Sequence, residues 1–224
     1  MTQRGPRIVL LGKQGAGKGT QASRLAEHFG VIDVATGDVF RGAARDGTPY
    51  GVEAQRYMEK GELVPDDIVV GVVEEMLGRD DNIARGFILD GFPRTVRQAE
   101  ELERVLADHP LDLVIDLDVP TEIVLHRIAG RRVCTNCGTV YHVDNPPKKN
   151  WTCDVCGGEV IQRDDDTEDA VMRRLELYEI QTLPLIHYYR RKGKLAHVDG
   201  HGESDEVFNA LLQTVEARAD RNSK

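Results

Sequence analysis

The sequence has little aromatic content and no long hydrophobic run. Only 5% of its 224 residues are aromatic, and its apolar stretches, such as 8–11 and 113–115, are far shorter than the roughly 20 residues that span a bilayer. Positive charge is also in deficit, because 29 Lys and Arg oppose 38 Asp and Glu, a formal net charge of −9. The chain therefore lacks the general basic surface that binds nucleic acid or anionic lipid, and any phosphate site must be local.

Cysteine is also scarce, and its spacing is informative. The four cysteines form two Cys-x-x-Cys pairs, Cys134 with Cys137 and Cys153 with Cys156, with 15 residues between the pairs. This spacing fits a four-cysteine zinc site, in which closed tetrahedral coordination leaves a structural role only. Two disulfides, free thiols or a redox pair are the alternatives. Residues 1–7 are not followed by the hydrophobic segment that a secretion signal contains, so we expect a cytoplasmic protein.

Short apolar runs alternate with longer segments of helical periodicity. This alternation predicts an α/β fold with a parallel five-stranded sheet and helices on both faces. Pro184 is expected to kink the long helix predicted at 168–192. The expected strands are 8–11, 31–35, 87–89, 113–119 and 195–198. The expected helices are 17–29, 37–46, 51–60, 66–79, 96–107, 122–129, 168–192 and 205–218. The candidate N-cap residues are Thr36, Thr95, Thr121, Thr167 and Ser204.

A glycine-rich loop, GKQGAGKGT at 12–20, follows the first predicted strand and opens a helix. Glycines allow successive backbone N–H groups to face phosphate oxygens, the helix N-terminus adds positive potential, and Lys18 reaches the β- and γ-phosphates. Gly19 stands where such loops commonly carry the Ser or Thr that meets magnesium, and Thr20 follows one residue later. The alternative is a glycine-rich turn with a chance lysine. The loop predicts a triphosphate site formed by Gly15, Ala16, Gly17, Lys18, Gly19 and Thr20.

Three further motifs follow in order: TGD at 36–38 with Arg41, DGFPR at 90–94, and GRRV at 130–133. With the phosphate loop, they make the chain similar to adenylate kinase over almost its whole length. The cysteine pairs resemble the zinc-bearing lid of many bacterial members. One departure is Lys13-Gln14, where the family commonly has a proline before Gly15.

This resemblance implies the P-loop NTPase type of fold and an activity. The expected reaction is transfer of the terminal phosphoryl group from MgATP to AMP, giving two ADP, in a monomer. The expected organisation is a single P-loop kinase domain over 1–224, with a helical monophosphate-binding insertion at 35–64 and a lid with the zinc site at 130–166. A kinase for UMP or CMP on the same fold is one alternative. The other is an ATP-gated regulator whose zinc ribbon binds nucleic acid or a partner.

The resemblance also implies roles for individual residues. Arginines offset the charge of a moving phosphoryl group without a titration step. Asp90 ends a predicted strand, where a carboxylate can hold magnesium through water; Asp116 is the weaker magnesium candidate. The expected catalytic set is Lys18, Asp90, Arg94, Arg131, Arg163 and Arg174. On the ATP side, Arg127, Arg131, Val140, Tyr141 and Gly202 join the phosphate loop. The expected AMP contacts are Thr36, Arg41, Glu62, Leu63, Val64, Gly91, Phe92, Pro93, Arg94, Gln98, Arg163 and Arg174.

Several of these positions have a plain structural interpretation as well. Gln98 fits a capping box in which it bonds back to the Thr95 amide, whereas the family uses the matching glutamine to recognise the adenine of AMP. Val140 and Tyr141 are expected near the ATP adenine, or else they pack the hairpin of the insertion. Gly202 is equally suited to a turn.

Overall fold

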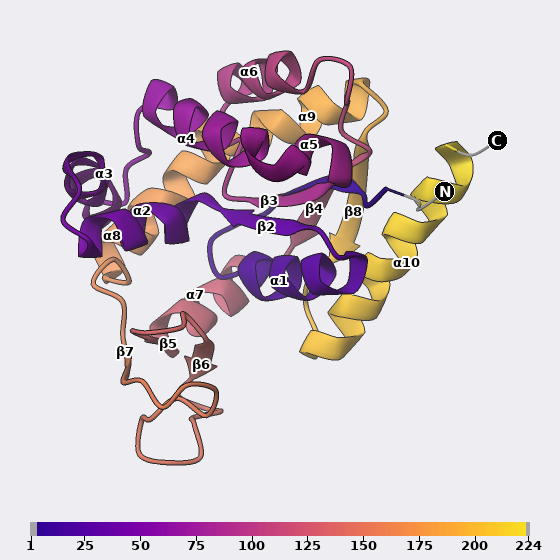
Figure 1. Cartoon of the computed structure of the whole chain (residues 1–224). Helices are drawn as coiled ribbons and strands as arrows, with labels where there is room; N and C mark the ends of the chain where they lie inside the picture. Colours follow the sequence, from indigo (N-terminus) through magenta and orange to yellow (C-terminus); the bar gives the residue numbers. More distant parts are fainter. Residues whose placement is uncertain (1–3, 223–224) are drawn as a thin grey trace.

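A computed structural model of the chain describes residues 4–222. Its centre is a parallel sheet of five strands in the order β2-β3-β1-β4-β8 (Figure 1). This confirms the α/β architecture predicted from the sequence. The strands are β1 (Arg7–Leu11), β2 (Ile32–Ala35), β3 (Phe87–Asp90), β4 (Leu113–Asp118) and β8 (Leu195–Asp199).

Helices cover both faces of this sheet, and side chains of β1 alternate between two hydrophobic clusters. Ile8 and Leu10 pack into one cluster with residues of α1 (Lys18–Phe29), α7 (Thr121–Ala129) and α10 (Ser204–Asn222). Val9 and Leu11 pack into the other with residues of α4 (Asp66–Gly78), α6 (Val96–Leu106) and α9 (Leu183–Arg191). Strands buried on both faces are continuously apolar, which explains why short apolar runs identified them.

Two helices, α2 (Thr36–Arg45) and α3 (Pro49–Glu59), lie between β2 and α4. They pack closely because Gly51 has no side chain: a Cβ there would lie 2.2 Å from the carbonyl carbon of Ala43. A short 3₁₀ turn, η1 (Arg79–Asp81), and a four-residue helix, α5 (Asn82–Arg85), precede β3. The sequence analysis did not predict these two elements, since they are too short to show a period.

The cysteine-containing insertion forms a separate small sheet, which projects from the core in Figure 1. Its strands are β5 (Arg131–Cys134), β6 (Val140–His142) and β7 (Val160–Ile161), antiparallel in the order β6-β5-β7. Its buried cluster contains only Cys134, Cys153 and Val160, with Tyr141 packed against them. A hydrophobic core of this size is too small to stabilise the three-stranded sheet by itself.

The long helical segment near the C-terminus is interrupted near Pro184, as expected. It consists of α8 (Glu168–Leu177), a π-helical turn η2 (Tyr178–Thr182) and α9, in whose first turn Pro184 lies. Among the described residues, no helix has the length and apolar composition that a membrane crossing requires.

The predicted N-caps are partly confirmed. Thr95 and Thr167 accept hydrogen bonds from the amides of Gln98 and Ala170. Thr36 and Thr121 were wrong as caps, because helices α2 and α7 already begin at these residues. Ser204 is likewise the first residue of α10.

Candidate active site

The loop between β1 and α1 has the backbone shape of a phosphate cradle. Gly12, Gly15 and Gly17 have φ angles of 140°, 81° and 102°, which favour glycine. A side chain at Gly15 would also lie 2.7 Å from Cγ1 of Ile128 on α7. The loop therefore wraps closely over the core and ends at the N-terminus of α1, where free amides attract anions.

Lys18 lies inside this loop. Its Nζ donates to the carbonyl oxygens of Gly12 and Lys13, at 2.8 and 2.9 Å. Burial lowers the pKa of Lys18, while the nearby carboxylate of Asp90 acts in the opposite direction. A phosphate in the cradle would give this half-buried ammonium group a charged partner in place of two carbonyls.

The structure explains the glycine at position 19. A Cβ on Gly19 would lie 3.3 Å from Oδ2 of Asp90, so glycine leaves room for this carboxylate beside the first turn of α1. Asp90 ends β3, as the sequence indicated. Carboxylate oxygen is the ligand type that Mg²⁺ prefers, and its place beside the phosphate loop fits a nucleotide-bound magnesium.

Asp116 is less suited to that task. It is buried on β4, where its Oδ2 lies 3.3 Å from Nδ1 of His197 on the neighbouring strand. Burial raises its pKa. The structure thus places Asp116 in the sheet-end role that made it the weaker magnesium candidate.

Arg94 lies next to the phosphate loop on the segment after β3. Its Nε donates to the carbonyl of Gly91 at 2.8 Å, and burial lowers its pKa against the attraction of Asp90. The Thr36 hydroxyl is 3.5 Å from the carbonyl oxygen of Asp90. The peptide bond between Phe92 and Pro93 is cis.

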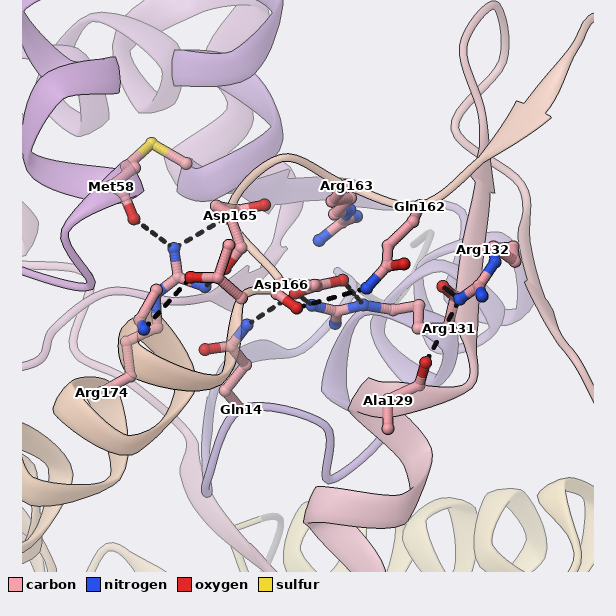
Figure 2. Close-up of polar contacts among 12 residues, drawn as sticks. Gln14, Met58, Ala129, Arg131, Arg132, Gln162, Arg163, Asp165, Asp166 and Arg174 are labelled. Carbon is pink, nitrogen blue, oxygen red and sulfur yellow. Dashed lines mark hydrogen bonds and ion pairs between the residues drawn. The ribbon is translucent and has the colours of Figure 1, made fainter.

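On the lid side, Arg131 makes a two-pronged ion pair with Asp166 (Figure 2). Asp166 also accepts a hydrogen bond from Nε2 of Gln14 in the phosphate loop, at 3.3 Å. Oε1 of Gln14 is buried without a hydrogen-bond partner. The residue that stands where the family commonly has proline thus connects the phosphate loop with the lid arginine through Asp166.

A second arginine group surrounds Asp165. Arg174 donates to the Asp165 carboxylate at 2.7 Å and to the carbonyl of Met58 at 2.6 Å (Figure 2), and Arg41 lies 3.5 Å from the same carboxylate. Although burial opposes it, the charges of Arg174 and Arg41 hold the pKa of Asp165 below its ordinary value. Burial, with the neighbouring charge of Arg41, lowers the pKa of Arg163 to about 10.

Sequence reasoning identified these arginines but missed their acidic partners. Asp165 and Asp166 are both buried, and Asp38 accepts from Arg41 at 2.6 Å and from Arg163 at 3.4 Å. The consecutive aspartates directly after Arg163 were the available signal, since carboxylates are rarely buried unless they are paired.

Residues 62–64, which are among the expected AMP contacts, lie close to the core. Val64 is buried in the core cluster. Gly61, just before Glu62 and Leu63, has a φ of 71° and faces the carbonyl of Ala170 so closely that a Cβ would lie 2.3 Å from its oxygen. The segment that contains residues 62–64 is therefore held against the start of α8.

Gln98 is buried and doubly bonded. Its Oε1 accepts the amide of Arg94 at 2.7 Å, and its Nε2 donates to Asp66 at 2.6 Å. The capping box was wrong in one bond, because Gln98 reaches the amide of Arg94 and not that of Thr95. Its amide orientation is fixed by these two bonds, which leave one N–H and one lone pair for a ligand.

The expected contacts on the ATP side fall into two groups. Arg127 donates to the carbonyls of Ala16 at 3.1 Å and Gly200 at 3.2 Å, which ties the phosphate loop to the segment that carries Gly202. Val140 is exposed. The hydroxyl of Tyr141 bonds to Cys153 (described next), so an adenine role for Val140 and Tyr141 stays a prediction.

The four cysteines form one compact cluster. The Sγ atoms of Cys134 and Cys156 are 3.4 Å apart, and those of Cys137 and Cys153 are 3.6 Å apart. Four thiolates at 2.3 Å from a tetrahedral zinc would be about 3.8 Å apart, so the cluster fits zinc. The Tyr141 hydroxyl donates to Cys153 Sγ and lowers the pKa of this thiol to about 5, which favours the thiolate that binds metal.

Comparison with known proteins identifies the family. The family model described as adenylate kinase matches residues 10–194. An adenylate kinase of Thermodesulfovibrio yellowstonii is 51% identical over 215 residues, 95% of this chain and 100% of that protein. Those of Bacillus subtilis and Methanosarcina acetivorans are each 50% identical, over 90% and 91% of this chain and 94% and 95% of their own lengths. The chain belongs to the adenylate kinase family.

Proposed function

We propose that the protein transfers the terminal phosphoryl group of MgATP reversibly to AMP, giving two ADP. The observation that carries this proposal is the set of charged groups around the phosphate loop. Asp90 of β3 lies beside the first turn of α1, Arg94 follows on the next segment, and Arg131 of the lid reaches the loop through Asp166 and Gln14. Such a set holds phosphates and offsets charge that spreads over a moving phosphoryl group.

The chain's own residues bind and orient, and none serves as a covalent intermediate. The phosphate loop and Lys18 hold the donor triphosphate, while Arg94 and Arg174 hold the acceptor phosphate in line with it. Arg131 and Arg163 come from the lid and neutralise charge on the transferred group. Asp90 would hold a magnesium ion through water, and the ion would supply positive charge that offsets the donor phosphates.

The acceptor base is proposed to lie beside Thr36, residues 62–64 and Gln98. Gln98 supports this proposal because its amide is fixed by Arg94 and Asp66 and retains one donor and one acceptor. The N6 amino group of adenine is a donor and its ring nitrogen an acceptor, a pair that matches this amide. Because other bases also present an adjacent donor and acceptor, the preference for AMP rests on the family's use of the matching glutamine to recognise adenine.

The two insertions have separate proposed tasks. The 35–64 segment would close over the monophosphate and the 130–166 lid over the triphosphate, and closure would exclude water that would otherwise hydrolyse ATP. Zinc in the cysteine cluster would hold the lid strands together and take no part in the reaction. We also propose that the protein acts as a monomer.

The test is acceptor choice. Purified protein is mixed with MgATP and, separately, with AMP, CMP, UMP or GMP, and diphosphate formation is followed against a control without acceptor. Rapid ADP formation with AMP is expected. Preference for another monophosphate would contradict the roles of Thr36 and Gln98. If none of the four monophosphates gave turnover, the proposed reaction would be refuted.

A further inference from the structure

Away from the active site, three metal-ligating side chains meet at the base of the lid. His126 is exposed on α7, His142 ends β6, and Asp144 lies two residues further along. Oδ2 of Asp144 is 2.9 Å from Nε2 of His126 and 3.2 Å from Nδ1 of His142. One ligand atom from each of the three residues lies within 4.8 Å of the others. No role described so far uses this cluster.

Two of the three separations between ligand atoms match a coordination polyhedron. Nitrogen and oxygen ligands at about 2.0–2.2 Å from a metal lie roughly 2.9–3.5 Å apart when they occupy neighbouring positions. Both measured separations fall within this range. The side chains of His126 and Asp144 are 68% and 64% exposed, so small rotations suffice to bring the three ligand atoms around one ion.

Hydrogen bonds around His142 fix its protonation. Its Nε2 lies 3.3 Å from the carbonyl oxygen of His126, to which it can only donate, and its Nδ1 accepts the backbone N–H of Asp144 at 3.1 Å. In the neutral ring, the single lone pair of Nδ1 therefore accepts the amide of Asp144, and the Asp144 carboxylate lies 3.2 Å from the same nitrogen. A histidine that ligates metal typically donates its other N–H to a carbonyl in this way.

The cluster also spans the joint between core and lid. Gly130 connects α7 to β5, and a Cβ there would lie 2.0 Å from Nε2 of His142, so only glycine lets this ring pack against the joint. The amide of Val143 donates to the carbonyl of Gly130 at 2.9 Å. His142 is directly opposite Arg131 in the β5–β6 ladder. An ion bound here would tie the lid strand that pairs with Arg131 to helix α7.

From these observations we infer that His126, His142 and Asp144 form a second metal site, separate from the cysteine cluster, for a divalent transition metal such as Zn²⁺. Two imidazoles with one carboxylate select zinc, cobalt or nickel over magnesium or calcium. Three protein ligands leave the remaining positions to water. On binding, the ion replaces the amide of Asp144 at Nδ1 of His142 and any proton on Nε2 of His126.

The test is a titration of Zn²⁺ into the full-length protein whose cysteine cluster is already loaded, followed by calorimetry and metal analysis. One further equivalent is expected in the unmodified protein. Binding at least about tenfold weaker is expected for His126→Ala and for Asp144→Asn, since even outer-shell changes cost roughly 10- to 100-fold in metal affinity. The added ion should raise the melting temperature of the unmodified protein but not that of His126→Ala.

The matched control is His187→Ala, which removes an exposed histidine from α9 and should bind as the unmodified protein does. The circular dichroism spectrum of each variant checks that it folds. Absence of a second equivalent in the unmodified protein overturns the inference, and so does a second equivalent of unchanged affinity in His126→Ala.

Discussion

Asp33 is the residue whose burial has the clearest consequence for stability. It lies on β2, where its Oδ2 accepts from the Ser23 hydroxyl at 2.7 Å and its Oδ1 is buried without a partner. Burial raises the pKa of Asp33 to about 6, partly offset by the Ser23 bond, and the nearby charges of Asp90 and Asp38 act in the same direction as burial. The folded chain therefore holds the proton of Asp33 up to a higher pH than the unfolded chain does.

The sign of the pH dependence follows. Between pH 4 and pH 6 the folded chain keeps a proton that the unfolded chain has lost, so stability falls as the pH rises through this window. Asp33→Asn removes the charge and should raise the free energy of unfolding at pH 7.5 by about 1 to 2 kcal/mol, with the gain vanishing near pH 4. Urea unfolding at several pH values measures it, with Asp108→Asn, at an exposed site, as control. A gain that does not change with pH would contradict this explanation.

Arg94 is the residue with the largest expected effect on turnover. Arg94→Ala should lower kcat by about 10³-fold or more, because a planar guanidinium offsets charge on the moving phosphoryl group. Its melting temperature should change little, since burial already disfavours this charge. Steady-state kinetics that separate kcat from KM measure the effect.

The control for Arg94 is Arg104→Ala. Arg104 is an exposed arginine of α6 paired with Glu101 and Glu74, so its loss should leave both constants unchanged. A kcat within tenfold of the unmodified protein in Arg94→Ala would remove Arg94 from the proposed reaction.

At the scale of elements, the sequence predicted most of what has a regular period. The five strands and the long helices were expected because apolar residues recur along them. Helix starts at Thr36 and Thr121 were misjudged by one residue, since a threonine near a helix start does not reveal whether its own backbone is helical. The helix α5, with four residues, has no period to detect.

The candidate site also contains features that the sequence predicted and features that it did not. The phosphate loop, Arg94, Arg131 and the cysteines were predicted from local motifs, and Arg163 and Arg174 from the family resemblance. The contact of Gln14 with Asp166 spans 152 positions, and the pairing of Arg174 with Met58 spans 116. Such contacts arise only when the lid and the 35–64 segment fold back on the core, so no local pattern contains them.

The lid sheet is the element that we expect to depend most on the proposed zinc. Its backbone bonds, such as Thr135 N to Glu159 O at 2.9 Å, run between short strands that share one small buried cluster. Zinc–thiolate bonding contributes on the order of 10 kcal/mol in isolated zinc-finger peptides. Removing zinc should therefore unfold residues 130–166 while the five-stranded sheet stays folded.

Hydrogen exchange measures this difference element by element. After chelation, amides of β5, β6 and β7 should lose protection, while those of β1, β3 and β4 keep it, and added zinc should restore the lid. Cys153→Ser should show the same unprotected lid before any chelator is added. Lid amides that stay protected in protein shown to hold no zinc would mean that the strands do not need the metal.

At the scale of the whole molecule, the lid and the 35–64 segment touch. Arg45 on α2 donates to the carbonyl of Thr135 in the lid at 2.8 Å, and the lid residue Arg163 lies 3.4 Å from Asp38. The second contact uses an arginine that we assign to phosphate binding, whereas the first does not. Arg45 can therefore be changed to test closure without touching the proposed reaction.

Arg45→Ala should shift the ligand-free protein toward a more open arrangement. One exposed hydrogen bond contributes about 0.5 to 1.5 kcal/mol, which changes the ratio of closed to open molecules by roughly 2- to 10-fold. Fluorescence energy transfer between labels at the exposed positions Tyr50 and Lys148 measures the separation of the two segments. With saturating nucleotides the variant and the unmodified protein should agree, because phosphates then hold both segments.

Arg56→Ala is the matched control, since Arg56 is an exposed arginine on the neighbouring helix α3 and should leave the ligand-free distances unchanged. If Arg45→Ala gives the same distances as the unmodified protein without nucleotide, the Arg45 contact does not hold the segments together. Closure would then rest on Asp38 and Asp165, whose arginine partners are the groups that phosphates would take over. In that case the same carboxylates that hold the segments together would compete with the nucleotides for their arginines.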